Sequence, residues 1–179
     1  MGKRSHFSDR IWSNKPERES VYHSLFKVGN MKISELQKFV RDLVERDETV
    51  IASRAAVIAA DDGSTAEEVE RALAEVSLAV VILAPKWRPT STAAKKPVGI
   101  LTVTVRVAEV PALNREGDFT TGIDLAEHLA ILLNLERPEP SHDILVVDEP
   151  GISASLGPDR STVVWDVPFK TLHQLSERN

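Results

Sequence analysis

The chain has 179 residues, of which 42% are hydrophobic and 27% are charged, and its formal net charge is −5. This composition is typical of one folded soluble domain, and the lack of any cysteine excludes a disulfide framework, a thiolate nucleophile and a cysteine-type zinc site. No stretch approaches the roughly 18 apolar residues of a membrane span, and no secretory signal is recognisable, so we expect no membrane partner.

Residues 1–30 differ from the rest of the chain in charge and in pattern. They carry six Lys or Arg and three Asp or Glu, a net charge of +3, so residues 31–179 carry −8. A domain with that charge is not suited to neutralising a phosphate backbone, and we expect no nucleic-acid partner. We predict that residues 1–30 are an extension and residues 31–179 a single domain. Because Met31 would itself be a natural start, the extension is either a docking arm or not native.

The next segments are predicted to be a helix, a strand and a short helix. Apolar residues recur at helical spacing after Ser34, which would form a capping box with Gln37. Residues 49–63 are rich in β-branched side chains and end in a turn signal, which predicts a strand. A second capping box, Ser64 with Glu67, precedes the predicted short helix.

Two strands with a long loop between them are predicted to form a β-hairpin. "VSLAVVILAP" is apolar throughout, as expected of a strand buried on both faces. "VGILTVTVRVAEVP" alternates, which places Arg106 on its polar face with two threonines. Residues 85–97 form an exposed basic loop at the tip of this hairpin. A tryptophan among cations there suits an interface anchor, and the alternative is a plain solvated loop. The residues concerned are Lys86, Trp87, Arg88, Lys95 and Lys96.

The last part of the chain is predicted to contain a helix and two strands. The helix has an apolar stripe from Ile123 to Leu133 and ends at Pro138. Ile144 to Val147 form a buried strand, residues 149–161 a loop, and "TVVWDVPF" a final alternating strand.

Two features resemble a nucleotide site. "ILVVDEP" has the form of a Walker B strand, in which Asp148 would hold Mg²⁺ and Glu149 would polarise a water molecule. "GDFTTGID" has the glycine spacing of a phosphate-binding loop, but Ile123 occupies the lysine position and Asp118 would repel an anion. The pattern therefore favours a buried strand and a turn over an ATPase.

No other pattern indicates catalysis or metal binding. The five histidines are scattered without ligand spacing, and His128 is expected to be a partly exposed helix residue rather than a base. Asp61 and Asp62 could converge with Asp148 and Glu149 on Mg²⁺, because both pairs end strands. Acidic residues at strand ends are more often solvated turn residues, so we predict no catalytic residue, cofactor or metal.

The order of elements, the turn "EVPALNR" and the closing strand "VVWDVPFKTL" resemble the tail terminator (tail completion) proteins, minor tail proteins of long-tailed bacteriophages and prophages. The resemblance covers about residues 31–175. It implies an α+β fold with a mixed, largely antiparallel sheet of four to five strands, two main flanking helices and a long hairpin.

The resemblance also implies a structural virion-assembly protein rather than an enzyme. Such proteins form a hexameric ring that caps the tail tube, ends its polymerisation and presents the surface for head joining. The expected partners are further copies of the chain, the tail-tube protein and head-completion or connector proteins. The expected location is the bacterial cytoplasm during assembly and then the virion.

Interface contacts are expected in the basic hairpin loop, at Arg106 and at Asn114 and Arg115. Two alternatives remain: a small Mg²⁺-dependent nucleotide-binding or hydrolytic enzyme that uses Asp148 and Glu149, and a generic bacterial partner-binding module.

Overall fold

A computed structural model describes residues 32–60, 65–90, 98–113, 120–138, 143–158 and 160–174. The predicted extension and Ser64 lie outside these residues. The elements, in chain order, are α2 (Ile33–Arg46), α3 (Glu48–Ser53), β1 (Ala56–Ala59), α4 (Thr65–Val76), β2 (Leu78–Ile82), β3 (Lys86–Pro89), β4 (Val98–Glu109), α5 (Gly122–Leu133), β5 (Val146–Val147), β6 (Ser153–Leu156) and β7 (Val163–Gln174).

The described strands form one mixed sheet with the path β1-β2-β4-β7-β5, to which β3 adds on β4 and β6 on β7. Among the described strands only β1 and β2 are parallel, and β4 and β7 pair along twelve residues each. The predicted α+β class with a largely antiparallel sheet is confirmed, but the sheet has seven strands rather than four to five. The extra strands are β3 and β6, which occupy segments predicted to be loops.

The predicted hairpin is present, with its first arm divided between β2 and β3. β2 pairs with one half of β4 and β3 with the other half. The prediction of a loop is therefore wrong for Lys86–Pro89, whereas Lys86, Arg88 and Pro89 are exposed as predicted. The basic and proline residues of this segment do not favour a strand by local propensity. The segment is a strand because it pairs with β4.

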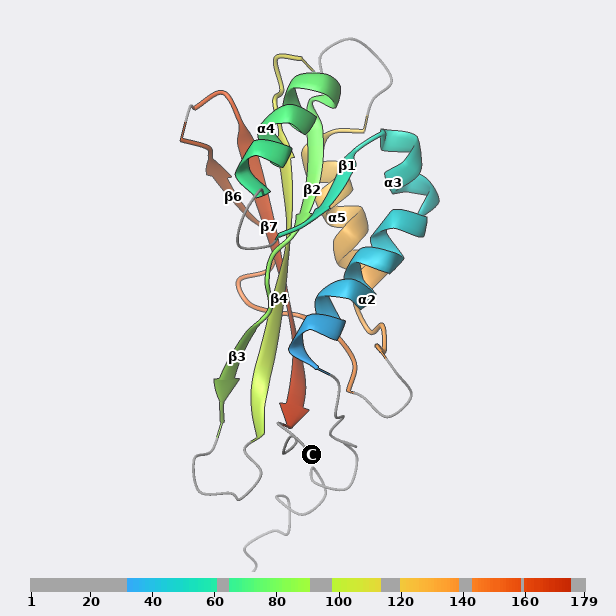
Figure 1. Cartoon of the computed structure of the whole chain (residues 1–179), viewed down its shortest axis with the longest axis vertical. Helices are drawn as coiled ribbons and strands as arrows, with labels where there is room; N and C mark the ends of the chain where they lie inside the picture. The colour runs from blue at the N-terminus through green and yellow to red at the C-terminus, as the bar shows by residue number, and fades with distance from the viewer. Residues whose placement is uncertain are drawn as a thin grey trace, which may run out of the picture.

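One face of the sheet carries the main core. α2, α3 and α5 lie together on this face, whereas α4 lies on the opposite side over β1 and β2 (Figure 1). The alternation predicted for β4 is confirmed, because its odd-numbered residues from Leu101 to Val107 are fully buried under the helices. Val167 and Phe169 of β7 are buried beside them. This burial of apolar surface is the main stabilising term of the fold.

The described residues cover the opposite face, here called the open face, only near one end. There α4 contributes Ala72 and Leu73 to a small cluster with Ile58, Ala79 and Ala108. These side chains are mostly small, so α4 contributes less apolar burial than the helices of the main core. The rest of the open face carries polar and half-buried side chains, beginning with Arg106.

The start of α2 differs from the prediction. The helix begins at Ile33, and Glu35 accepts a hydrogen bond from the backbone N–H of Lys32 at 2.8 Å. Gln37, predicted to be part of a capping box, instead donates to the backbone carbonyls of Ala60 and Ile82, both at 2.9 Å. A tertiary contact thus took the place of the local one, and Gln37 joins α2 to the ends of β1 and β2.

Residues 49–53 are helical rather than extended. Asp47 accepts from the backbone N–H groups of Thr49 and Val50, which starts α3, and Arg54 ends it with φ 58°. An aspartate N-cap followed by a left-handed residue confines this β-branched segment to a short helix. The predicted strand therefore shortens to Ala56–Ala59.

The last predicted helix is confirmed with changes at its face and its end. Leu125 rather than Ile123 belongs to its buried stripe, and Ile123 is exposed. The helix ends at Leu133, before Pro138, because Asn134 is extended and Leu135 has φ 69°. Among the helices of the described residues, none is both long enough and apolar enough to cross a bilayer.

Candidate functional site

The centre of the open face carries a cross-strand ion pair. Arg106 of β4 lies directly opposite Asp166 of β7. Its Nε donates to Asp166 Oδ1 at 2.8 Å and its Nη2 to Oδ2 at 3.0 Å. The hydrogen bond with Asp166 raises the pKa of Arg106. Both side chains are partly exposed, by 40% and 28%, so this bidentate pair contributes little to stability and is accessible to a partner.

A second pair lies further along β7. Lys170 Nζ donates to Asp148 Oδ1 at 2.7 Å. This hydrogen bond is the main reason why the pKa of Asp148 lies below its ordinary value, and the positive charge of Arg88 lowers it further. Asp148, the Mg²⁺ ligand of the alternative enzyme hypothesis, is thus engaged by a cation of the protein itself, and Glu149 is exposed.

The described residues contain no group of three or more acidic or histidine side chains that could hold a metal ion. Asp61 and Asp62, which were considered with Asp148 and Glu149, lie outside the described residues.

The start of α5, considered above as part of a phosphate loop, is occupied by a carboxylate of the chain. The backbone N–H of Gly122 donates to Glu109 Oε2 at 3.1 Å. Glu109 is only 5% exposed, and a Cβ at Gly122 would lie 2.3 Å from the Trp165 ring. A phosphate at this amide would have to displace a buried carboxylate, which argues against the nucleotide reading.

The two basic side chains of β3 lie on the open face. Lys86 and Arg88 are exposed and stand opposite Thr102 and Ile100 of β4, on the face that carries Arg106. Lys95, Lys96, Asn114 and Arg115 lie outside the described residues.

Trp87 points to the other side of β3, where it packs half-buried against the main core. A Cβ at Gly99 would lie within 2.6 Å of the indole ring, so the ring fills the space that glycine leaves. Its Nε1 is buried and has no hydrogen-bond partner among the described residues. This ring is a packing element of the monomer, whereas the sequence reading had placed it on an exposed loop.

His128 is partly exposed, as predicted, and it links two helices. Its Nε2 lies 2.8 Å from Asp47 Oδ1, the atom that caps α3. These residues are 81 positions apart, and nothing in either local pattern indicates the contact. It is best explained as a structural tie between α5 and the start of α3.

A groove borders the Arg106–Asp166 pair on the side of α4. It has a volume of about 520 Å³ and a mainly apolar lining from α4, β2 and β4, with Arg106 among its residues, and from Gly157, Pro158, Thr162 and Val164. This groove could not be predicted from the sequence, because α4 is distant in the chain from Pro158 and Val164. The roles of Asp166 and Lys170 were not predicted either, although the alternation of the last strand places both on the polar face.

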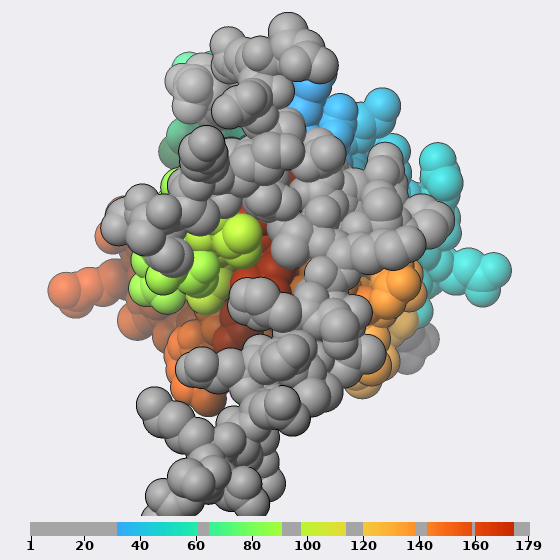
Figure 2. All heavy atoms as spheres, turned by 90° about the horizontal axis from the view of Figure 1, so that it is seen from below, coloured from blue at the N-terminus to red at the C-terminus, as the bar shows by residue number. Residues whose placement is uncertain are grey.

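At the lower end of the molecule, atoms of β3 and β4 lie beside those of the end of β7 (Figure 2). This arrangement agrees with the pairing of both strands along β4. The open face is therefore a continuous surface built on the two longest strands, with Lys86, Arg88, Arg106, Asp166 and Lys170 along it.

The fold is that of an α+β protein with helices mainly on one face of a mixed sheet, and it has a counterpart among solved structures. A chain in the structure "Virion of native gene transfer agent (GTA) particle" superposes with a TM-score of 0.55 and 16% sequence identity. The match covers 78% of this chain and 94% of that chain. At this identity the likeness concerns the fold. No protein-family model and no curated protein matches the sequence.

Proposed function

We propose that this chain is a structural protein of a phage-like particle that caps the tail tube as a hexameric ring. The cap ends tail polymerisation and provides the surface to which the head joins. The observation that carries the proposal is the fold shared with almost the whole of a chain from a gene transfer agent virion. The tail-terminator resemblance of "EVPALNR" and "VVWDVPFKTL" supports the same class of protein.

The open face suits contact with other proteins of such a particle. It is long, because β4 and β7 pair over twelve residues each, and its charges are arranged as partly exposed pairs. Paired charges at a rim direct register and partner choice more than they add affinity. Arg106, Lys86 and Arg88 are therefore the proposed contacts with the tube protein or with a neighbouring subunit.

The acidic residues of "ILVVDEP" fit this non-enzymatic role. Asp148 is held by Lys170, and the first amide of α5 is held by Glu109. A carboxylate already paired with a cation is a poor Mg²⁺ ligand, because the metal would have to replace a charge-assisted hydrogen bond. The proposal therefore assigns no cofactor, metal or catalytic residue to the chain.

The proposal is tested by deleting the gene in a strain that produces the particle and measuring tail lengths by electron microscopy. We expect tubes of uncontrolled length without heads, and restoration of normal particles by the wild-type gene. Headed tails of normal length in the deletion strain would contradict the proposal. A thermal-shift titration with ATP and Mg²⁺ tests the enzyme alternative, for which ligand-dependent stabilisation is expected; we expect no shift.

A further inference from the structure

Large apolar side chains remain exposed at several places on the described surface. The seven residues are Ile51, Leu113, Ile123, Ile131, Leu135, Val146 and Leu156. Single exposed apolar residues need no explanation, but two of these places are complementary to each other in shape and in charge. One is a protruding stripe on α5, and the other is a cavity beside Leu113.

The outer surface of α5 carries the stripe. Ile123, Glu127 and Ile131 are spaced by four residues, which places them along one side of the helix. Ile131 is 78% exposed, more than any other large apolar residue among those described. It projects away from the buried stripe of Leu125, Leu129 and Leu133, as expected from helical geometry. Burial in the monomer therefore does not explain an isoleucine at this position.

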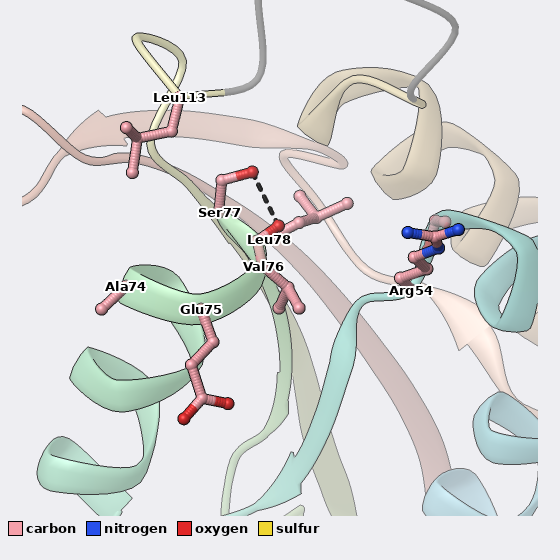
Figure 3. A pocket seen from close by; sticks show the side chains of 8 residues that line it. Arg54, Ala74, Glu75, Val76, Ser77, Leu78 and Leu113 are labelled. Atoms are coloured by element: carbon pink, nitrogen blue, oxygen red, sulfur yellow. Dashed lines mark hydrogen bonds between the residues drawn. The ribbon is translucent and has the colours of Figure 1, made fainter. Parts of the chain in front are cut away.

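The cavity lies between the end of α3, the α4–β2 turn and the segment after β4. Its volume is about 320 Å³, which is ample for one aliphatic side chain. In Figure 3, Leu113 lies on the α4 side of the cavity and Arg54 lies on its α3 side, while Glu75 points away from both. Leu113 is 60% exposed, and Arg54 forms no ion pair with another described residue.

We infer that the α5 stripe of one copy of this chain docks on the Leu113–Arg54 cavity of the next copy. Ile131 would enter the cavity and contact Leu113, and Glu127 would pair with Arg54. Glu127 forms no ion pair within the described part of its own chain, so the two opposite charges are both available for this contact. An apolar protrusion and a negative charge on one copy thus match a cavity and a positive charge on the next.

The occupant is a second copy because both halves of the match belong to this chain and lie at different places on it. Contact between different surfaces of identical subunits is heterologous, and such contacts close into rings when the rotation allows. The inference rests on the proposed ring, and it specifies which surfaces hold the ring together. This contact is additional to the one proposed at Arg106 of the open face.

Disulfide trapping tests the contact directly, because the wild-type chain has no cysteine. Chains with Ile131→Cys alone and with Leu113→Cys alone, carrying tags of different size, are mixed and oxidised. We expect mixed dimers to exceed both homodimers at least tenfold, and a chain with both substitutions to give a ladder of covalent oligomers. Val146→Cys, at an exposed position of β5 away from the residues that line the cavity, is the matched control and should give no excess of mixed dimers.

A charge exchange provides an independent readout. Glu127→Arg and Arg54→Glu should each weaken self-association about tenfold or more, as for a central interface charge, and the double exchange should restore it. Both residues are exposed, so each variant should keep the wild-type melting temperature. Additive losses in the double exchange would overturn the pairing.

The outcomes separate this inference from the proposed function. An oligomer by light scattering without mixed disulfides, or with homodimers from Ile131→Cys alone, would overturn the proposed contact and leave the ring in place. Normal tail lengths in the gene-deletion strain would instead overturn the proposed function, whatever the disulfides show.

Discussion

Replacing Arg106 by glutamate should weaken assembly while leaving the monomer folded. The substitution removes two hydrogen bonds of 2.8 and 3.0 Å to Asp166 and places two carboxylates opposite each other on β4 and β7. Because both native side chains are partly exposed, by 40% and 28%, loss of the pair costs about 1 kcal/mol of unfolding free energy. Like-charge repulsion across the strands adds about as much.

The total cost of about 2 kcal/mol is below the 5–15 kcal/mol that typically stabilises a domain. For a chain of this length it corresponds to a fall in melting temperature of about 4–8 °C. Urea unfolding of the monomer measures the first quantity, and light scattering over a concentration series measures self-association, which we expect to weaken more than tenfold.

The exchanged pair, Arg106→Glu with Asp166→Arg, is the matched control. It should recover the urea midpoint but not the association, because a partner would meet each charge in the wrong place. Loss of more than about 4 kcal/mol in the single variant would refute the reasoning, since only a buried pair costs that much to break. Full recovery of association in the exchanged variant would show that the pair acts on the fold alone.

Three further substitutions test the packing and the charges. Gly122→Ala should cost about 2–3 kcal/mol in urea unfolding, because the new methyl group meets the Trp165 ring and disturbs the hydrogen bond to Glu109; an unchanged midpoint would contradict this packing. Trp87→Ala should lower the free energy of unfolding by about 2–3 kcal/mol because the indole packs on the core, and Trp87→Phe should lower it less. Equal urea midpoints for Trp87→Ala and the wild type would show that the indole does not pack on the core. Lys170→Met should raise the pKa of Asp148 towards its ordinary value, as followed by carboxylate NMR. Because the folded pKa is lowered, the stabilisation from this pair is present above about pH 4 and lost as pH falls through the folded pKa, so the stability difference between the wild type and Lys170→Met should disappear in acid.

Periodicity located the elements that bury a continuous stripe. The alternation of β4 from Leu101 to Val107 and the apolar run of β2 follow directly from the geometry of a strand with one or two buried faces. The helices α2, α4 and α5 follow from helical spacing in the same way. These predictions succeed because the spacing of apolar residues within each segment shows which of its sides is buried.

The other elements depend on contacts between distant residues. β3 is a strand because β4 supplies its partner, and β6 because β7 does, although neither segment has strand propensity by itself. The short helix α3 differs from these strands, because its start is local: Asp47 accepts from the backbone N–H groups of Thr49 and Val50, and the β-branched residues of the segment outweighed this signal.

The candidate site also contains residues that could be predicted from local pattern and residues that could not. Arg106 was recognised as a residue of the polar face because its own strand alternates. Its partner Asp166, sixty residues away, required the register of β4 and β7. The α5 stripe could have been found from the four-residue spacing of Ile123, Glu127 and Ile131, but its exposure depends on which side of the helix the sheet occupies.

The mass of the full chain in solution is the most direct test of the proposed ring. Native mass spectrometry and light scattering are carried out together over a wide range of concentration. We expect a closed species of about six copies, reached without larger aggregates as concentration rises. A monomer at every concentration, or an open series of ever larger oligomers, would contradict a chain that closes on itself as a cap.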